Sequence, residues 1–409
     1  MQSIKEIREQ FPILGTTVNG KPLVYLDNAA SAQRPQSVTG KWLSLVEEAN
    51  ANIHRGLHRL SNEATREYED TREAVRAFIN AESAREIIFT SGATASVNLV
   101  AFSFGEAFVR EGDEVIVSVA EHHSNIVPWQ MMCSRRKASL KVLDIDKNGL
   151  LQPDALEKLI SQKTKIIAIS QCSNVLGLKN DIKSLVQTAH KKGVPVLVDG
   201  AQGIVHSAVD VRDLDCDFYV FSGHKMYAAT GTGVLYGKLK WLQEMPPYMG
   251  GGEMIQSVSF ENTVYAQSPA KFEAGTQNFN SVPTLVPAME FLRSARESAL
   301  VEREQESIVE FMLEQLRADC RIRLYGDTGR REDKIPLFSI AVDGAHHEDL
   351  ALILDKMGIA TRSGQMCAEP LMDRLGVTGL LRISFAPYNT LEEAEYFIKS
   401  LRRAIEMLI

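Results

Sequence analysis

The sequence predicts an α/β protein with a large domain, built on a mostly parallel central sheet, and a smaller C-terminal α+β domain. Three observations predict this fold. Apolar β-branched runs alternate with helix-like segments between residues 84 and 237, a glycine-rich break follows near residue 250, and the pattern of the tail changes after a long helical stretch. With 409 residues, the chain is long enough to bury a sizeable core and to divide in two.

Seven short runs predict the central sheet, and several of them are apolar on both faces. Strands of this kind are typical of parallel sheets covered by helices, and segment 182–192 has the periodicity of a covering helix. In chain order the runs are EIIFT, DEVIVSV, LKVLDI, KIIAIS, VPVLVDG, CDFYVFS and GVLYG.

The C-terminal part predicts a second, smaller unit. One long helical stretch over 282–318 leads to the strand IPLFSIAVDG, a helix over 346–357, the strand LRISFAP and a final helix. Thr390 and Glu393 form a capping-box pattern at the start of that last helix. The predicted organisation is an N-terminal segment that packs near the small domain, a large domain and a small domain, over residues 1–20, 21–290 and 291–409.

Composition narrows the class of protein. The net charge of -7 and the absence of a lysine- or arginine-rich block argue against nucleic acid as a partner. No segment approaches the ~18 uninterrupted apolar residues of a membrane span, and the first residues do not resemble a signal peptide, so we expect a cytoplasmic protein. Five cysteines without a CxxC pair suit a reducing compartment and suggest neither zinc nor disulfides.

Polar side chains close five of the predicted strands, at the edge where ligands bind in open parallel sheets. Each alone has an ordinary explanation as a turn residue, a helix cap, a satisfied histidine or a surface lysine. Together they match what pyridoxal 5′-phosphate (PLP) needs: a phosphate cradle, an aspartate for its ring nitrogen, a stacking ring and a lysine for a Schiff base. The residues are Thr94, His122, His123, Asn174, Asp199, Gln202, Ser222, His224 and Lys225.

The motif VDGAQGIVH followed by DFYVFSGHKMY resembles the fold-type I, class V aminotransferase superfamily of PLP enzymes. Further motifs resemble group II cysteine desulfurases of the SufS and CsdA kind, in the same order and over nearly the whole chain. They are LDNAASAQRP, NIHRGLHRLSNEAT, EHHSNIVPW, FEAGTQN, TRSGQMCAEPL and LRISFAPYNT. The resemblance implies a fold-type I PLP-dependent transferase that acts as a homodimer.

The resemblance also implies roles for individual residues. Lys225 would carry PLP as a Schiff base, Asp199 would face the pyridine nitrogen, Gln202 would neighbour the ring hydroxyl and His122 would stack on the ring. The phosphate would be held by Thr94, Ser222 and His224, and by Thr276 of the second subunit.

Substrate binding is assigned in the same way. Asn174 and Arg382 would orient the substrate, Arg382 through a bidentate bond to its carboxylate. Arg362 lies five residues before Cys367, as in the R-T-G-x-H-C loop of the family. His54 and Arg55 match a segment that, in such dimers, approaches the site of the neighbouring subunit.

Cys367 has a chemical reason to stand in its loop, because removing sulfur from cysteine requires a nucleophile that attacks the substrate sulfur, and thiolates suit that task. The other four cysteines are expected to be small buried hydrophobes in helices or strands: Cys133, Cys172, Cys216 and Cys320. The loop departs from the family at Met366, where histidine is common, so the thiol would lack that local help. Ala95, Ala228 and Ala229 also differ from common residues of relatives.

The predicted function is a cysteine desulfurase that converts L-cysteine to L-alanine and leaves a persulfide on Cys367 for an acceptor protein of the SufE/CsdE kind. Iron–sulfur cluster assembly and tRNA thiolation are both possible destinations for that sulfur. The alternatives are a selenocysteine lyase acting on L-selenocysteine, another class V PLP reaction and a non-enzymatic PLP-binding scaffold for sulfur trafficking.

Overall fold

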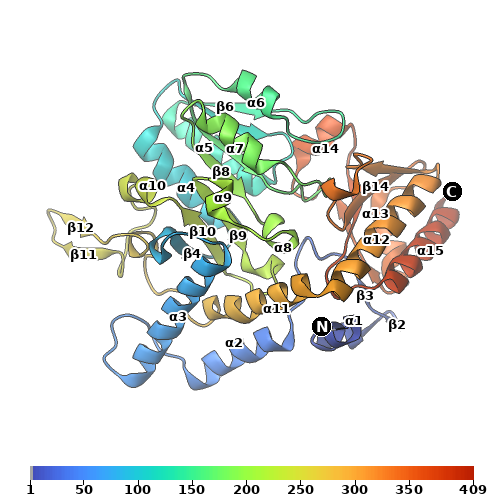
Figure 1. Ribbon diagram of the computed structural model, residues 1–409, viewed down its shortest axis with the longest axis horizontal. Helices are drawn as coiled ribbons and strands as arrows, with labels where there is room; N and C mark the ends of the chain where they lie inside the picture. The colour runs from blue at the N-terminus through green and yellow to red at the C-terminus, as the bar shows by residue number, and fades with distance from the viewer. Residues whose placement is uncertain (1–2) are drawn as a thin grey trace.

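A seven-stranded sheet forms the centre of the larger part of the computed structural model, which describes residues 3–409 (Figure 1). Its strand order is β4-β10-β9-β8-β7-β5-β6, and all neighbours are parallel except β10, which runs antiparallel to β4 and β9. The predicted mostly parallel sheet is confirmed, and each of the seven runs supplies one strand. The strands are β4 (Ile87–Thr90), β5 (Glu114–Ser118), β6 (Ser139–Leu143), β7 (Thr164–Ser170), β8 (Val196–Asp199), β9 (Phe218–Ser222) and β10 (Gly233–Gly237).

Helices bury both faces of this sheet. On β7, Ile166 and Ala168 pack in one apolar cluster with α4 (Ala93–Phe108) and α5 (Val127–Arg136), whereas Ile167 and Ile169 pack in another with three further helices. These are α3 (Arg59–Phe78), α7 (Ile182–His190) and α11 (Leu285–Glu297). Burial on both faces explains why the strand sequences lack a polar alternation.

A four-stranded antiparallel sheet in the order β13-β14-β17-β16 forms the smaller part. Its core is shared with three helices, and the predicted capping box is present at the last of them, since Thr390 and Glu393 each accept a hydrogen bond from the other's backbone N–H. The elements are β13 (Ile322–Tyr325), β14 (Leu337–Val342), β16 (Arg362–Gly364), β17 (Leu380–Ser384), α12 (Ala299–Ala318), α13 (His347–Lys356) and α15 (Leu391–Leu408).

The long helical stretch predicted over 282–318 is wrong as a single element. Ser298 has an extended backbone, so α11 ends before it and α12 begins after it, and the chain turns there from the large sheet to the small one. No glycine or proline marks this break in the sequence. Neither did the sequence predict the projecting hairpin of β11 (Ile255–Val258) and β12 (Thr263–Tyr265) (Figure 1).

The N-terminal segment contacts the smaller part. Arg8, in α1 (Ile4–Glu9), pairs with Glu393 at 2.9 Å and donates to the carbonyl of Tyr388 at 2.6 Å. The division into three parts drawn from the sequence stays a prediction. The remaining elements are β1 (Thr17–Val18), β2 (Lys21–Pro22), β3 (Val24–Tyr25), α2 (Gln36–Glu48), α6 (Pro153–Leu159), α8 (Gly203–His206), α9 (Val211–Leu214), α10 (Leu239–Glu244), β15 (Ile359–Ala360), α14 (Glu369–Leu375) and seven short 3-10 helices.

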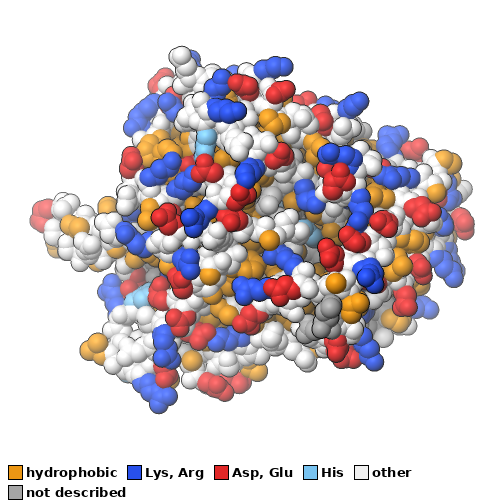
Figure 2. Space-filling view, in the orientation of Figure 1, with side chains coloured by type: hydrophobic (Ala, Val, Ile, Leu, Met, Phe, Trp, Pro, Cys, Tyr) orange, Lys and Arg blue, Asp and Glu red, His pale blue; other side chains and the backbone are white. Residues whose placement is uncertain are grey.

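Acidic and basic side chains are interspersed over the face shown in Figure 2, without a continuous basic stripe. Within residues 3–409, no helix combines the length and the hydropathy that crossing a bilayer requires.

Candidate active site

A pocket of about 480 Å³ lies at the carboxyl ends of the central strands and is closed on one side by residues of the smaller part. It brings together predicted residues from seven separate segments of the chain. These are Thr94, His122, Asn174, Asp199, Gln202, Ser222, His224, Lys225, Arg362, Cys367 and Arg382. The predicted residues that do not line it are His54, Arg55, His123 and Thr276.

Lys225 stands in the 3-10 turn that directly follows β9, with its side chain in the pocket. No described residue forms a hydrogen bond or an ion pair with its Nζ atom. Burial lowers the pKa of Lys225, although the nearby Asp199 carboxylate acts in the opposite direction. The structure therefore presents a partly buried amine that gives up its proton more readily than a surface lysine.

Asp199 closes β8, the strand beside β9, and is buried. Its Oδ1 atom accepts a hydrogen bond of 2.9 Å from the backbone N–H of Ala201, and no described residue forms an ion pair with it. Burial raises its pKa. A buried carboxylate without an ion-pair partner favours a cationic group placed beside it.

His122 follows β5 and lines the same pocket. Its Nδ1 atom lies 2.8 Å from Ser124 Oγ, and burial, followed by the charge of Lys225, lowers its pKa to about 4. The imidazole is thus neutral at pH 7. The adjacent Glu121, which the sequence did not single out, is fully buried, has its pKa raised by burial to about 7 and accepts a 2.7 Å hydrogen bond from Asn125. It helps to fix the turn that presents His122.

The N-terminus of α4 forms another wall. Ser222 Oγ accepts a hydrogen bond of 2.8 Å from the Ala93 backbone N–H, and Thr94 in the first turn lines the pocket with no hydrogen bond from its side chain to a described residue. A Cβ atom at Gly233 would lie 2.4 Å from the Gly92 Cα atom, so glycine allows β10 to pack closely against this turn. Free N–H groups and hydroxyls at a helix N-terminus suit an anion.

Two arginines share one carboxylate at the opposite wall. Arg382, on β17, is only 3% exposed, and its Nη2 atom lies 3.2 Å from Asp27 Oδ1, while Arg362 Nη2 lies 2.8 Å from Asp27 Oδ2. Arg382 Nη1 donates to the Asn174 carbonyl at 3.0 Å, but its buried Nε has no hydrogen-bond partner. The sequence analysis missed Asp27, although it closes the run VYLD as Asp199 closes VLVD.

Cys367 lies in the turn between β16 and α14 and is exposed. Met366 and Cys367 both have a left-handed backbone, with φ of 55° and 54°, which costs non-glycine residues ~1–2 kcal/mol each. Hydrogen bonds from the large part hold this turn: His123 N–H donates to the Cys367 carbonyl at 2.7 Å, and Asn174 Nδ2 donates to the Met366 carbonyl at 2.9 Å. The Met366 side chain is buried and lines the pocket.

The other cysteines divide into two groups. Cys133, Cys172 and Cys216 are buried as predicted, and burial raises their pKa, to about 11 for Cys133 and about 12 for Cys172. Cys172 follows the end of β7 in the chain and also lines the pocket. The prediction for Cys320 is wrong, because α12 ends at Ala318 and leaves this residue exposed in the following turn.

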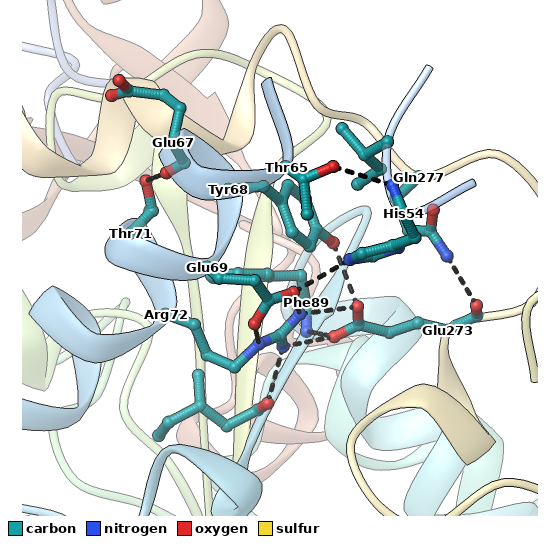
Figure 3. A network of polar contacts seen from close by, with 12 residues as sticks. His54, Thr65, Glu67, Tyr68, Glu69, Thr71, Arg72, Phe89, Glu273 and Gln277 are labelled. Atoms are coloured by element: carbon teal, nitrogen blue, oxygen red, sulfur yellow. Dashed lines mark hydrogen bonds and ion pairs between the residues drawn. The ribbon is translucent and has the colours of Figure 1, made fainter. Parts of the chain in front are cut away.

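A separate network holds His54 and the segment of Glu273 and Gln277 in place (Figure 3). Arg55 follows His54 in the sequence, and Thr276 precedes Gln277. His54 Nε2 lies 3.1 Å from Glu69, which also contacts Arg72, and Arg72 forms a buried ion pair of 2.6 Å with Glu273. Glu273 belongs to the same FEAGTQN segment as Thr276. Arg55 is paired with Glu253.

The sequence and the structure are both similar to those of known proteins. Residues 24–397 match the family model described as aminotransferase class-V. Proteins named cysteine desulfurase from Shigella flexneri and Serratia proteamaculans are 44% and 45% identical over 407 residues, with 99% of each chain covered.

Two solved structures are similar over their whole length. The cysteine desulfurase CsdA from Escherichia coli has a TM-score of 0.90 at 38% identity, with 100% of both chains covered. The apo cysteine desulfurase from Thermococcus onnurineus NA1 has a TM-score of 0.92 at 33% identity, covering 100% of this chain and 99% of that one. The chain therefore belongs to the aminotransferase class-V family, and within it to the cysteine desulfurases.

Proposed function

We propose that this protein is a PLP-dependent cysteine desulfurase that converts L-cysteine to L-alanine and keeps the sulfur as a persulfide on Cys367. The observation that carries the proposal is the single pocket lined by Lys225, Asp199, Arg382 and Cys367. An amine, a buried carboxylate, a guanidinium and a thiol from different parts of the chain converge there, which suits covalent cofactor binding and sulfur transfer on one substrate.

The residues present fit PLP. Among the described residues, Lys225 Nζ forms no hydrogen bond and Asp199 forms no ion pair, and His122 is neutral, as a stacking ring should be. Gln202 Nε2 donates to the Ala29 carbonyl at 2.8 Å, which leaves its Oε1 for the ring hydroxyl. The phosphate would lie at the N-terminus of α4 with these side chains: Thr94, Ser222 and His224.

When bound, the cofactor withdraws electrons from the substrate and so stabilises negative charge at its Cα atom. Side chains of the protein bind the substrate and transfer its protons. Arg382 binds the substrate carboxylate, and Asp27 together with the Asn174 carbonyl fixes the plane of its guanidinium. Lys225, with its lowered pKa, is the group that takes the Cα proton and later returns a proton.

Cys367 removes the sulfur. Its thiolate attacks the substrate sulfur, a sulfur–sulfur bond forms, the bond between Cβ and sulfur breaks, and the electron pair stays with Cβ, which then takes up a proton. The sum is L-cysteine plus the Cys367 thiol giving L-alanine plus the Cys367 persulfide. Atoms and electrons balance without an external oxidant or reductant.

The exposure of Cys367 supports delivery of the persulfide to an acceptor protein of the SufE/CsdE kind. All five cysteines are free, which suits a reducing compartment such as the cytoplasm. We propose on these grounds that the protein acts in the cytoplasm and passes its sulfur to such an acceptor.

The active unit would be a homodimer. His54, Arg55 and Thr276 lie outside the pocket of their own chain, and contacts with Glu69 and Glu253 hold His54 and Arg55, which supports a role in the site of the neighbouring subunit. A mixture of Lys225→Ala and Arg55→Ala proteins should regain activity through hybrid dimers with one intact site. A fully active monomer would contradict the dimer.

The test of the function is product analysis. Purified protein incubated with L-cysteine and a thiol reductant should form L-alanine and sulfide in equal amounts. In a separate sample, borohydride treatment should fix the pyridoxyl group to the peptide that contains Lys225. Transamination products without sulfide, or a pyridoxyl group on another lysine, would contradict the proposal.

A further inference from the structure

A second cavity, of about 270 Å³, lies where α11 gives way to α12. Four basic side chains from separate segments line it: Lys179 after β7, His206 in α8, Arg296 in α11 and Lys334 before β14. None of them lines the candidate active site. One isolated β-bridge, between Leu178 and Lys334, brings the segments of Lys179 and Lys334 together.

In the described part of the chain, the lysines and the arginine of this cavity form no ion pair, although the charge of Asp327 acts on Lys334. Lys334 Nζ donates instead to two carbonyl oxygens, those of Leu176 at 2.6 Å and Gly326 at 2.9 Å. Of the described residues that line the cavity, Glu302 alone is acidic, and it is exposed.

Arg296 has donor capacity to spare. Its Nη2 atom donates to the Ile204 carbonyl and its guanidinium lies over the Phe78 ring, but its buried Nε has no hydrogen-bond partner among residues 3–409. Burial is the main reason that the pKa of the His206 imidazole is lowered, and the positive charges of Arg296 and Lys179 lower it further. Like charges gathered in a partly buried space are unfavourable unless an anion joins them.

The walls of the cavity define the size and polarity of that anion. Apolar side chains make up much of the lining, among them Leu292, Val301, Ile335 and Phe385. The cavity volume of about 270 Å³ is several times the ~30 Å³ that one water molecule occupies in the liquid. The cavity therefore has room for a ligand larger than a single inorganic oxyanion. Cationic groups on several walls and apolar surface between them suit an organic acid with two separated carboxylates.

We propose that this cavity is a binding site for a small aliphatic dicarboxylate, whose carboxylates pair with Arg296 and with Lys179. Such a ligand would join the loop after β7, the linking helix α11 and the segment that enters β14. The site does not depend on the proposed desulfurase activity, because none of its lining residues lines the candidate active site.

The experiment measures binding of malonate, succinate, glutarate and adipate to the PLP-loaded protein by calorimetry at low ionic strength. At least one should bind, its neutral diamide should not, and added salt should weaken binding. Lys179→Gln should weaken binding by roughly tenfold, as expected for one lost charge-assisted contact. Lys179→Arg should retain it, and so should Lys191→Gln, which changes an exposed lysine outside the cavity.

Arg296→Gln serves as a second variant, and its folding is checked by circular dichroism. Arg382→Lys tests whether the acids bind in the active site instead. Loss of binding in Arg382→Lys with no change in Lys179→Gln and Arg296→Gln would overturn the proposal. So would the absence of binding by all four acids to the unmodified protein.

Discussion

The backbone N–H of His123 donates a hydrogen bond of 2.7 Å to the carbonyl oxygen of Cys367. This contact joins the turn that carries His122, on the large sheet, to the cysteine turn of the small sheet. His123 makes a second contact with the same turn, because its Nε2 accepts from the Glu369 N–H at 3.0 Å. The position of the thiol over the pocket therefore depends on both parts of the chain.

His123→Ala should loosen the cysteine turn, because it removes the acceptor for Glu369 while keeping the backbone contact. One neutral hydrogen bond is worth ~0.5–1.5 kcal/mol, so we expect the rate of persulfide formation to fall by about two- to tenfold. Hydrogen exchange in residues 365–369 should become faster, and PLP absorbance should not change. His123→Gln keeps an acceptor and is the control; equal exchange in all three proteins would rule out this role for His123.

Arg382→Lys should raise KM for L-cysteine while PLP stays bound. Lysine cannot hold a carboxylate with two parallel N–H groups, and it also loses the contact that Arg382 makes with Asp27. Loss of a charged hydrogen bond costs ~1.5–3 kcal/mol, which corresponds to a fall in kcat/KM of roughly 10- to 100-fold. Steady-state kinetics check this, and an unchanged KM would mean that another residue binds the substrate carboxylate.

The buried pair of Arg72 and Glu273 should behave differently in single and double variants (Figure 3). Arg72→Met leaves the Glu273 carboxylate buried and unpaired, which costs ~3–5 kcal/mol of unfolding free energy. Arg72→Met combined with Glu273→Leu should regain much of that loss, because the buried carboxylate of residue 273 is removed together with its partner. Urea unfolding of the three proteins measures it, and a double variant no more stable than the single one would contradict this account.

Stability of the cofactor-free protein should fall as the pH drops from about 6.5 to about 4. Burial lowers the pKa of His122 and of His224 to about 4 and that of His206 to about 3. Between these values and the ordinary pKa of 6.5 the unfolded chain binds protons that the folded chain does not, so acid favours unfolding. His206→Leu should lose stability less steeply between about pH 7 and about pH 5; equal slopes would show that His206 does not contribute.

Much of the fold could be predicted because the buried strands leave a strong local signal. Each of the seven apolar runs became a strand, and polar residues that close them, such as Asp199 and Lys225, meet in one pocket. This follows from the topology of parallel strands, whose carboxyl ends share one edge.

Contacts between distant segments could not be predicted. Asp27 and Arg382 meet across 355 residues, and the break at Ser298 depends on where two sheets pack rather than on a helix-breaking residue. The motifs did not predict the contacts of Met366 either. Its side chain is buried, and its carbonyl accepts a hydrogen bond from Asn174. Whether Met366 leaves the thiol less activated than a histidine would stays a prediction.

The most direct test of the account is the location of the sulfur after one turnover. The protein is incubated with L-cysteine without reductant, digested and analysed by mass spectrometry. We predict one added sulfur atom on the Cys367 peptide that cyanide or a thiol removes, and nearly complete loss of alanine formation in Cys367→Ala with PLP still bound. Added sulfur on the peptide of exposed Cys320 or of the pocket residue Cys172 instead, or normal desulfuration by Cys367→Ala, would contradict it.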